Sequence, residues 1–395
     1  SADTLHIRRE AQTGPPQVGE YSLAYPRAKE REEALNFEWS GLDSADFALR
    51  SVQLGSSTRH GVFLPAPASV VFDVTVPTGA RLDMDAVVLP PELQDGRSSD
   101  GAVLSIELED GSGWKTIDQV SLKVGDWDKV GVDLPDVAGG KAQLRFSAEG
   151  GEADLFDYVF LAEPTLYVPT AAPRRVLMVF IDTLRPDHMG FYGYERDTTP
   201  KLDSWAEKAH VFENARSVAP WTLPSARAAF SGHQPEAWGA VSTVQEILAG
   251  AGWATGAFVG NIYLSSNFDM SGGWSHHSVI NWPVAKIQVR EVERFLKRNK
   301  DRDAVAMLHL MDMHLPYEEP FRYRNIWAGK APAGLHDRAL RGSILKAEKK
   351  ESEAVRSWLK ARYDQNLRYL DDTLSKLFED LGEEVPVVIF SDHGE

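Results

Sequence analysis

The chain has 395 residues, of which 43% are hydrophobic and 25% are charged, a balance typical of a globular protein. This length exceeds what one compact core usually holds, so we expect two domains. With 42 basic and 58 acidic residues the net charge is −16, which argues against nucleic acid as a partner. The absence of cysteine excludes disulfides, thiolate metal sites and catalytic groups made from cysteine.

The two ends of the sequence suggest processing. The chain begins at Ser1 without a methionine, so we expect that a signal peptide has been removed or the chain trimmed. No run approaches the ~20 apolar residues of a transmembrane segment. We therefore predict a periplasmic or extracellular protein. At the other end the chain stops at Glu395, directly after an apolar run and a polar cluster, and we expect a domain cut short there.

Residues 1–167 predict an N-terminal arm followed by an all-β domain. The first 36 residues are polar, with one weakly helical stretch at 26–35. From about residue 37, short apolar runs are separated by Gly, Pro, Asp and Ser, and every second residue is apolar in Leu104, Ile106 and Leu108. This pattern is typical of a β-sandwich or jelly roll.

A Pro-containing linker at 168–175 separates this part from residues 176–395, where the pattern changes. Apolar strand-like runs now alternate with amphipathic helical stretches. We expect strands at 176–181, 254–259, 303–310 and 385–390, and helices near 200, after Pro224, over 286–299 and up to about 381. Such alternation predicts an α/β domain with a mostly parallel sheet and helices on both faces.

Polar side chains follow three of the expected strands where each strand ends. Asp182 follows the first, Asp312 and His314 follow the third, and Asp392 and His393 follow the last. Each alone has an ordinary explanation as a turn residue, a helix cap or a buried polar contact. Ligands of open α/β sheets bind beyond the carboxyl ends of the strands, so the three clusters together predict a site. Carboxylate and imidazole donors without thiolate suit a divalent cation.

A hydroxyl group provides the fourth element of the predicted site. Pro224 is well placed in the first turn of a helix, which puts Thr222 just ahead of the helix N-terminus. The helix dipole and free N–H groups there favour negative charge. Thr222 is then either a helix cap or a nucleophile, and a bound cation would favour the second role because it lowers the pKa of the hydroxyl.

Residues 174–395 resemble the N-terminal part of the sulfatase-like catalytic domain of the alkaline phosphatase superfamily. The matching segments occur in family order: DTLRPDHMGFYGYERDTTPKLDSWA, APWTLPSARAAFSG, GWATGAFVGN, HLMDMHLPY, YDQNLRYLDD and FSDHGE. The resemblance implies an alkaline-phosphatase-like fold, truncated at its C-terminus, because relatives carry further strands and at least one more His or Lys of the site. The all-β part resembles the jelly-roll accessory domains of secreted hydrolases.

The resemblance also implies a metal centre. Asp182, Asp392 and His393 match the family's metal ligands, and the oxygen of Thr222, at the nucleophile position, completes a site for one divalent ion. The identity of the ion stays open: Ca²⁺ is common in sulfatases, whereas Zn²⁺ or Mn²⁺ suits a histidine ligand with a threonine nucleophile.

Further residues are expected to contact the substrate. His314 matches the histidine that contacts the bound anion, and Arg185 is expected to help hold its oxygens. Arg227, Asn261 and Asp312 are expected to bind other parts of the substrate.

Three departures from the sulfatase pattern favour phosphate esters. Thr222 stands where sulfatases carry a Cys or Ser that becomes formylglycine, and a secondary alcohol cannot form that aldehyde. Ala226 replaces the arginine of the sulfatase signature, with Arg227 one position later, and Thr183 replaces a second metal-binding Asp.

The sequence therefore predicts a metal-dependent hydrolase or transferase of phosphate esters that works through a covalent threonine intermediate. The substrate would be an anionic ester carried on a glycan or a lipid. Two alternatives stay open: a sulfuric ester hydrolase, and a catalytically silent glycan-binding protein. The oligomeric state cannot be read from the sequence.

Overall fold

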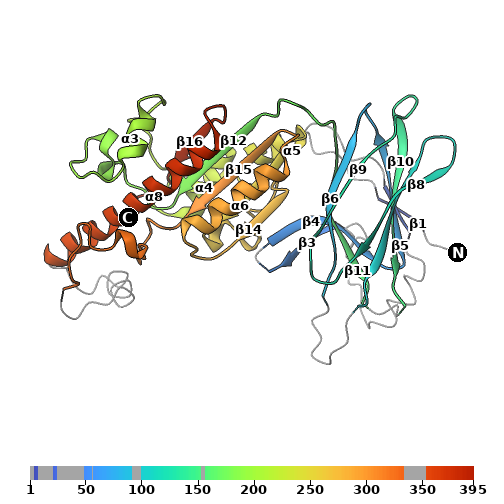
Figure 1. Cartoon of the computed structure of the whole chain (residues 1–395), viewed down its shortest axis with the longest axis horizontal. Coiled ribbons are helices and arrows are strands. Elements are labelled where there is room, and N and C mark those ends of the chain that lie inside the picture. The colour runs from blue at the N-terminus through green and yellow to red at the C-terminus, as the bar shows by residue number, and fades with distance from the viewer. Residues whose placement is uncertain are drawn as a thin grey trace. The chain divides into compact units, whose positions relative to one another are not determined.

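The computed structural model of the protein, drawn in Figure 1, describes residues 4–7, 21–24, 49–55, 57–90, 99–152, 156–332 and 353–395. The chain divides into two compact units: Ser1–Pro173 with Gly250–Gly252, and Arg174–Ala249 with Trp253–Glu395. The main boundary, after Pro173, lies within the predicted linker 168–175. The assignment of the two units as an accessory and a catalytic domain stays a prediction.

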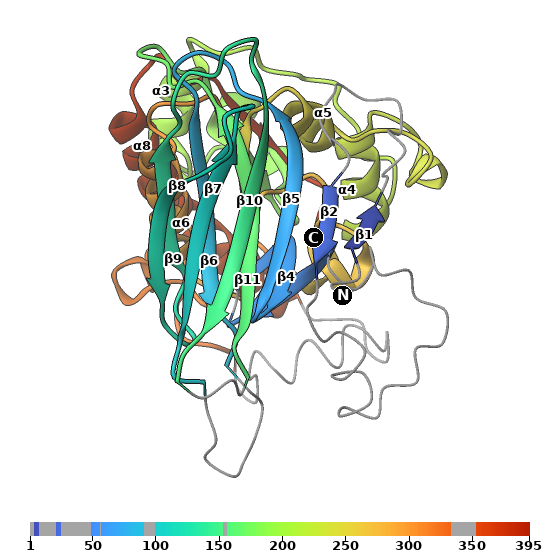
Figure 2. The ribbon, with the colours of Figure 1, turned by 90° about the vertical axis from the view of Figure 1, so that its right-hand side faces the viewer.

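The first unit is built from antiparallel strands (Figure 2). One sheet has the order β1-β2-β5-β10-β7-β8, and β3, β4, β11, β6 and β9 pair in that order in a second. The bounds are β1 Thr4–Ile7, β2 Tyr21–Ala24, β3 Leu49–Leu54, β4 Ser57–Pro65, β5 Ala68–Thr75, β6 Arg81–Val88, β7 Ala102–Glu109, β8 Trp114–Leu122, β9 Asp128–Asp133, β10 Lys141–Gly150 and β11 Tyr158–Tyr167.

Alternation along these strands produces their shared core. Leu104, Ile106 and Leu108 of β7 are buried, as their spacing predicts, and they belong to one apolar cluster with Leu82 of β6 and Leu161 of β11. The two sheets therefore bury side chains in a common interior. The jelly-roll topology of this unit stays a prediction.

The predicted N-terminal arm differs from the structure in its described parts. β1 pairs with β2, and β2 pairs with β5, so two short segments within the first 36 residues belong to a sheet. The helical stretch predicted at 26–35 lies outside the described residues.

The second unit contains a parallel sheet with the strand order β16-β12-β15-β13-β14. The bounds are β12 Arg175–Ile181, β13 Ala254–Val259, β14 His276–Val279, β15 Ala304–Leu310 and β16 Val387–Phe390. Four of the five strands lie where their apolar runs predict them. β14 was not predicted, because its four residues, HHSV, form no apolar run.

Helices cover both faces of this sheet, which confirms the predicted α/β architecture. Leu177 and Val179 of β12 share a buried cluster with α6 and α8, whereas Phe180 lies in a second cluster with Ala226 and Phe230 of α4. Successive residues of a strand point to opposite faces, so α6 and α8 cover one face and α4 covers the other. The main helices are α3 Pro200–Ala206, α4 Thr222–Ser231, α5 Val244–Gly250, α6 Ala285–Arg298 and α8 Glu353–Leu381.

Several features of this unit follow from burial on two sides. All seven residues of β15 are buried, which is why the strand reads as an almost continuous apolar run. On α8, an apolar stripe recurs every three or four residues and packs into the same cluster as α6; it consists of Tyr363, Leu367, Leu370, Leu374 and Leu377.

None of the helices in the described part of the chain has the length and hydrophobicity to cross a bilayer.

Candidate active site

The pairing of two neighbouring strands brings two carboxylates together. β12 and β16 run parallel with Phe180 opposite Phe390, and their rings stack with centroids 4.9 Å apart. Asp182 and Asp392 each lie two residues beyond this pair. Because the strands share one direction, both side chains lie at the same edge of the sheet, as the sequence predicts.

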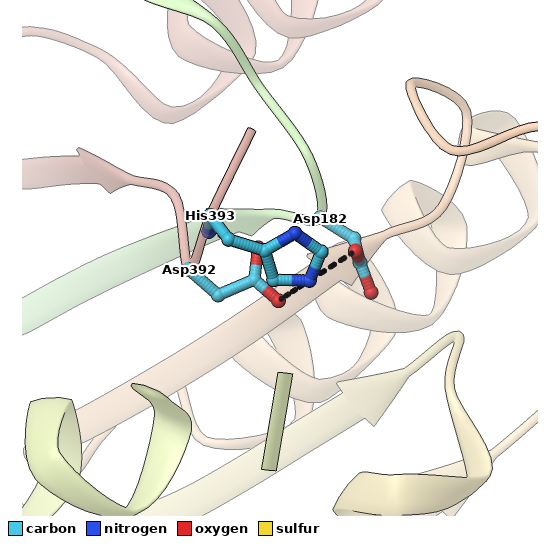
Figure 3. A group of neighbouring side chains, drawn as sticks. All are labelled: Asp182, Asp392 and His393. Atoms are coloured by element: carbon cyan, nitrogen blue, oxygen red, sulfur yellow. Dashed lines mark hydrogen bonds and ion pairs between the residues drawn. The ribbon is translucent and has the colours of Figure 1, made fainter. Parts of the chain in front are cut away.

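These carboxylates and His393 form a compact group (Figure 3). One ligand atom from each of Asp182, Asp392 and His393 lies within 4.8 Å of the others. His393 Nε2 is 3.7 Å from Asp182 Oδ1 and 3.4 Å from Asp392 Oδ2. The three residues predicted as metal ligands are therefore adjacent.

The chemistry of the group fits a cation. Asp182 and Asp392 are 0% and 3% exposed, and burial together with the charge of Asp182 raises the pKa of Asp392. Asp182 Oδ1 and Asp392 Oδ2 are buried without a hydrogen-bond partner among the described residues. Unpaired buried carboxylate oxygens are costly, and a divalent ion between them would offset that cost.

Thr222 lies beside this group. Its Oγ1 is 3.4 Å from Asp182 Oδ2 and 3.5 Å from His393 Nε2, and the residue is 4% exposed. The expectation that Thr222 precedes the helix is wrong, because α4 begins at Thr222 and Trp221, with extended backbone, is the N-cap residue. The Thr222 hydroxyl therefore points at the carboxylate cluster and does not cap the helix.

Asn261 connects β13 to the same cluster. It follows β13 and donates from Nδ2 to Asp182 Oδ2 over 3.0 Å, while its Oδ1 accepts from the N–H of Tyr263. The sequence predicts Asn261 as a substrate-binding residue, and that role stays a prediction. Its amide is hydrogen-bonded to the Asp182 carboxylate.

A sharp turn directly after Asp182 is held by a tyrosine. Thr183 has a φ of 57°, in the left-handed region, and its N–H donates to Asp392 Oδ1 over 3.1 Å. The hydroxyl of Tyr363 in α8 donates to the carbonyl of Thr183 and accepts from the N–H of Arg185. The sequence shows Tyr363 only as one position of an apolar stripe, so its phenol was missed.

The remaining predicted residues make other contacts in this structure. Arg185 pairs with Asp187 through two hydrogen bonds, of 2.9 and 2.6 Å. His314 Nδ1 lies 2.8 Å from the carbonyl of Leu315. Arg227 donates to the carbonyl of Phe268. The predicted roles of these side chains in holding the substrate are not tested by the contacts.

Asp312 is placed at the start of a helix. Its Oδ1 accepts from the N–H of Ala285, the first residue of α6, over 3.3 Å. Burial raises the pKa of Asp312 to about 7. Its predicted role in substrate binding also stays a prediction.

One buried histidine near the cluster was missed. His309 lies inside β15, is 0% exposed, and its Nε2 is 3.7 Å from Asp182 Oδ2. Burial lowers its pKa to about 4, so the imidazole is neutral near pH 7. The only signal in the sequence is a polar residue within the apolar run 303–310.

Exposed aromatic side chains flank two of the site residues. Trp221, next to Thr222, is 47% exposed, and Tyr263, two residues after Asn261, is 40% exposed. Their rings meet edge to face with centroids 5.7 Å apart. Two exposed rings in contact with each other therefore lie close in the sequence to Thr222 and Asn261.

Comparison with known proteins identifies the family. The sulfatase family model matches residues 174–395, more than half of the chain. The chain belongs to the sulfatase family. This match confirms the resemblance drawn from the motifs and covers the whole parallel sheet, together with the carboxylate cluster and Thr222.

Curated relatives are Kdo(2)-lipid A phosphoethanolamine 7''-transferases. The one from Escherichia coli (strain K12) is 26% identical over 296 residues, covering 67% of this chain and 49% of that protein. The one from Salmonella typhimurium is 24% identical over 236 residues, covering 56% of this chain and 39% of that protein. The chain thus spans less than half the length of these relatives.

Among solved structures, the C-terminal periplasmic domain of EcEptC from Escherichia coli is similar to this chain. It is 20% identical with a TM-score of 0.44, covering 56% of this chain and 64% of that domain. A second crystal structure of that domain, with a TM-score of 0.43, is a complex with zinc.

The turn after Asp182 gives a testable prediction. Replacing Tyr363 by Phe leaves a buried carbonyl and a buried N–H without their common partner, so we expect a loss of about 1–3 kcal/mol in the free energy of unfolding. Urea denaturation measures this loss. We also expect weaker metal binding, because the turn sets the position of Asp182.

The matched control is Tyr323→Phe, which removes a hydroxyl that donates to Asp372 away from the turn. Its metal affinity should equal that of the wild type. Wild-type metal affinity and unfolding energy in the Tyr363→Phe variant would contradict the assigned role of this phenol.

Asp312 gives a prediction on pH dependence. Its folded pKa of about 7 exceeds the ~3.9 of an unfolded Asp, so the folded state keeps a proton that the unfolded state has released. This contribution to stability is complete below pH ~4 and is lost as the pH rises through about 7. The side-chain amide of an Asp312→Asn variant would be neutral throughout.

The measurement is the urea midpoint of both proteins, with a chelator present, at several pH values between 5 and 8. Relative to the Asp312→Asn variant, the wild type should lose stability between pH 5 and about 7 and change little above that. Parallel curves for the two proteins would show that Asp312 titrates near its ordinary pKa.

Proposed function

We propose that the protein is a metal-dependent enzyme that transfers or hydrolyses phosphate esters, with Thr222 as its nucleophile. The observation that carries this proposal is the position of the Thr222 hydroxyl, 3.4 Å from Asp182 and 3.5 Å from His393. The position of this hydroxyl at a helix N-terminus, facing a buried carboxylate cluster, supports a role in chemistry rather than in capping.

The proposed ligands are Asp182, Asp392 and His393, with Thr222 Oγ1 completing the set. Two carboxylates and one imidazole suit one divalent ion, Zn²⁺, Mn²⁺ or Ca²⁺, and the unpaired oxygens of both carboxylates are consistent with it. When bound, the ion would lower the pKa of the hydroxyl and offset negative charge on the phosphoryl oxygens.

The protein's own residues would then carry out group transfer in two steps. Oγ1 of Thr222 gives up its proton to solvent and attacks phosphorus as the ester P–O bond breaks on the opposite side, and the departing alkoxide takes up a proton from solvent to leave as the alcohol. The free N–H groups at the start of α4 favour the negative charge of the substrate. The phosphorylated threonine then passes its group to water or to an alcohol acceptor.

His314 and Arg185 are proposed to contact the phosphoryl oxygens. Arg185 would leave Asp187 and bind the substrate, because the carboxylate of Asp187 and the phosphoryl oxygens are both negatively charged partners for its guanidinium. Asn261 would keep Asp182 oriented through its amide.

The relatives support transfer and suggest the substrate class. Two curated relatives are phosphoethanolamine transferases that act on Kdo(2)-lipid A, as their names state. We therefore propose a phosphate ester substrate or acceptor carried on a lipid or a glycan, in the periplasm or outside the cell. The exposed rings of Trp221 and Tyr263 would contact its uncharged part.

Sulfuric ester hydrolysis is the second candidate, favoured by the family model itself. Thr222 weakens it, because a secondary alcohol cannot be oxidised to the aldehyde that formylglycine sulfatases use. A catalytically silent glycan-binding protein is the third candidate. Two buried carboxylates beside a hydroxyl argue against it, because burying charged groups is costly and glycan binding alone does not require them.

The nucleophile is tested by a pair of variants. Thr222→Val keeps the shape of the side chain without its hydroxyl, so turnover of an aryl phosphodiester should fall by about 10³-fold or more. Thr222→Ser keeps a hydroxyl and should keep measurable activity. Both should still bind metal through the other three ligands, measured by calorimetry with Mn²⁺ and Zn²⁺.

A Thr222→Val protein as active as the wild type would reject Thr222 as nucleophile. Mass spectrometry of the quenched wild-type reaction provides an independent measurement, because the phosphoryl group should be found on the peptide that contains Thr222.

A substrate panel separates the two ester classes. We expect aryl phosphate esters, mono- or diesters, to be turned over faster than the matching aryl sulfate, and a chelator to remove the activity until a divalent ion is returned. Faster turnover of the aryl sulfate would make the protein a sulfuric ester hydrolase that uses threonine directly.

A further inference from the structure

The central strand of the parallel sheet carries a histidine that the proposed mechanism does not use. His309 lies in β15 between two buried leucines, and its ring meets the edge of Phe180 with centroids 4.5 Å apart. Among the described residues, two groups lie near its ring nitrogens: the N–H of Gly260 and the carboxylate of Asp182.

The first contact fixes the position of the proton. The N–H of Gly260, just after β13, donates to His309 Nδ1 over 3.2 Å. A ring nitrogen that accepts a hydrogen bond carries no proton, so in the neutral imidazole the proton is on Nε2. A protonated nitrogen has no lone pair for a metal, and His309 is therefore a hydrogen-bond donor and not a ligand.

Gly260 allows this contact because it lacks a side chain. A Cβ at this position would lie 2.8 Å from Met311 Cγ and 3.2 Å from the carbonyl oxygen of His309. The chain after β13 could not approach β15 as closely with any larger residue.

The second contact places Nε2 of His309 near Asp182. His309 Nε2 is 3.7 Å from Asp182 Oδ2, and in the described part of the chain it has no hydrogen-bond partner. The same oxygen accepts from Asn261 over 3.0 Å. The other oxygen, Oδ1, is the one 3.7 Å from His393 Nε2.

We propose that His309 is a positioning residue for the metal centre. Its Nε2–H and the amide of Asn261 hold Oδ2 of Asp182 and so turn Oδ1 toward the ion shared with His393 and Asp392. This inference rests on the proposed metal site. Donors that hold a ligating carboxylate keep it ionised and oriented, and their loss typically weakens metal binding about 10–100-fold.

Two variants of His309 separate the donor from the acceptor. In His309→Gln the side-chain amide can bring an N–H to the place of Nε2, whereas in His309→Asn the shorter side chain can only accept from Gly260. We expect His309→Asn to bind Mn²⁺ or Zn²⁺ about 10–100-fold more weakly than the wild type. His309→Gln should bind within a few-fold of it.

The readout is a competition titration with a chromophoric chelator, so activity is not needed. Wild-type affinity in His309→Asn would overturn the proposal, and so would an equal loss in both variants. A wild-type protein that binds neither ion would overturn the metal site of the proposed function as well, which distinguishes the two failures.

Nitrogen NMR of the wild-type protein labelled at histidine tests the same proposal without a substitution that could disturb folding. We expect His309 to show a proton on Nε2 and a bare Nδ1, with the Nε2–H signal shifting when Zn²⁺ or Ca²⁺ is added. A proton on Nδ1 would overturn the assignment.

Discussion

The structure depends on the parallel pairing of β12 with β16, which places two carboxylates at one edge of a buried sheet. Asp182 and Asp392 would repel each other there, and burial already makes ionisation of Asp392 harder. Three nearby groups contact these carboxylates and offset part of their negative charge. They are the imidazole of His393, the side-chain amide of Asn261 and the backbone N–H of Thr183. Asp182 Oδ1 and Asp392 Oδ2 accept no hydrogen bond from the described residues and are therefore the atoms that could contact a cation.

Contacts with helix α8 fix the position of the turn that follows Asp182. The turn after Asp182 requires a left-handed residue, and the Tyr363 hydroxyl of α8 binds both of its sides. α8 packs on the same face as α6, so the long helix that covers the sheet also fixes the loop that bears a predicted ligand. The packing of α8 on the sheet and the position of the turn after Asp182 are therefore coupled, and a substitution in α8 that moves Tyr363 should also move Asp182.

The fold of the second unit and the grouping of its acidic residues could be predicted from the sequence because both follow from simple rules. Apolar runs buried on two faces are visible without a structure, and the carboxyl ends of parallel strands must meet at one edge. The direction in which a side chain points is harder to predict from the sequence. From the sequence, Thr222 is either a helix cap or a nucleophile, and the extended backbone of Trp221 shows that Trp221 is the N-cap residue. Tyr363 and His309 sit at positions that look apolar, so their polar atoms are hidden until their neighbours across the sheet are known.

One consequence concerns the order in which the molecule is made. The N–H of Thr183 and the carboxylate of Asp392 that it binds are 209 positions apart along the chain. A nascent polypeptide leaving the ribosome would therefore carry Asp182 and the Thr222 hydroxyl well before the second carboxylate, Asp392, has been made. An ion held by both carboxylates would then bind only after β16 has paired with β12.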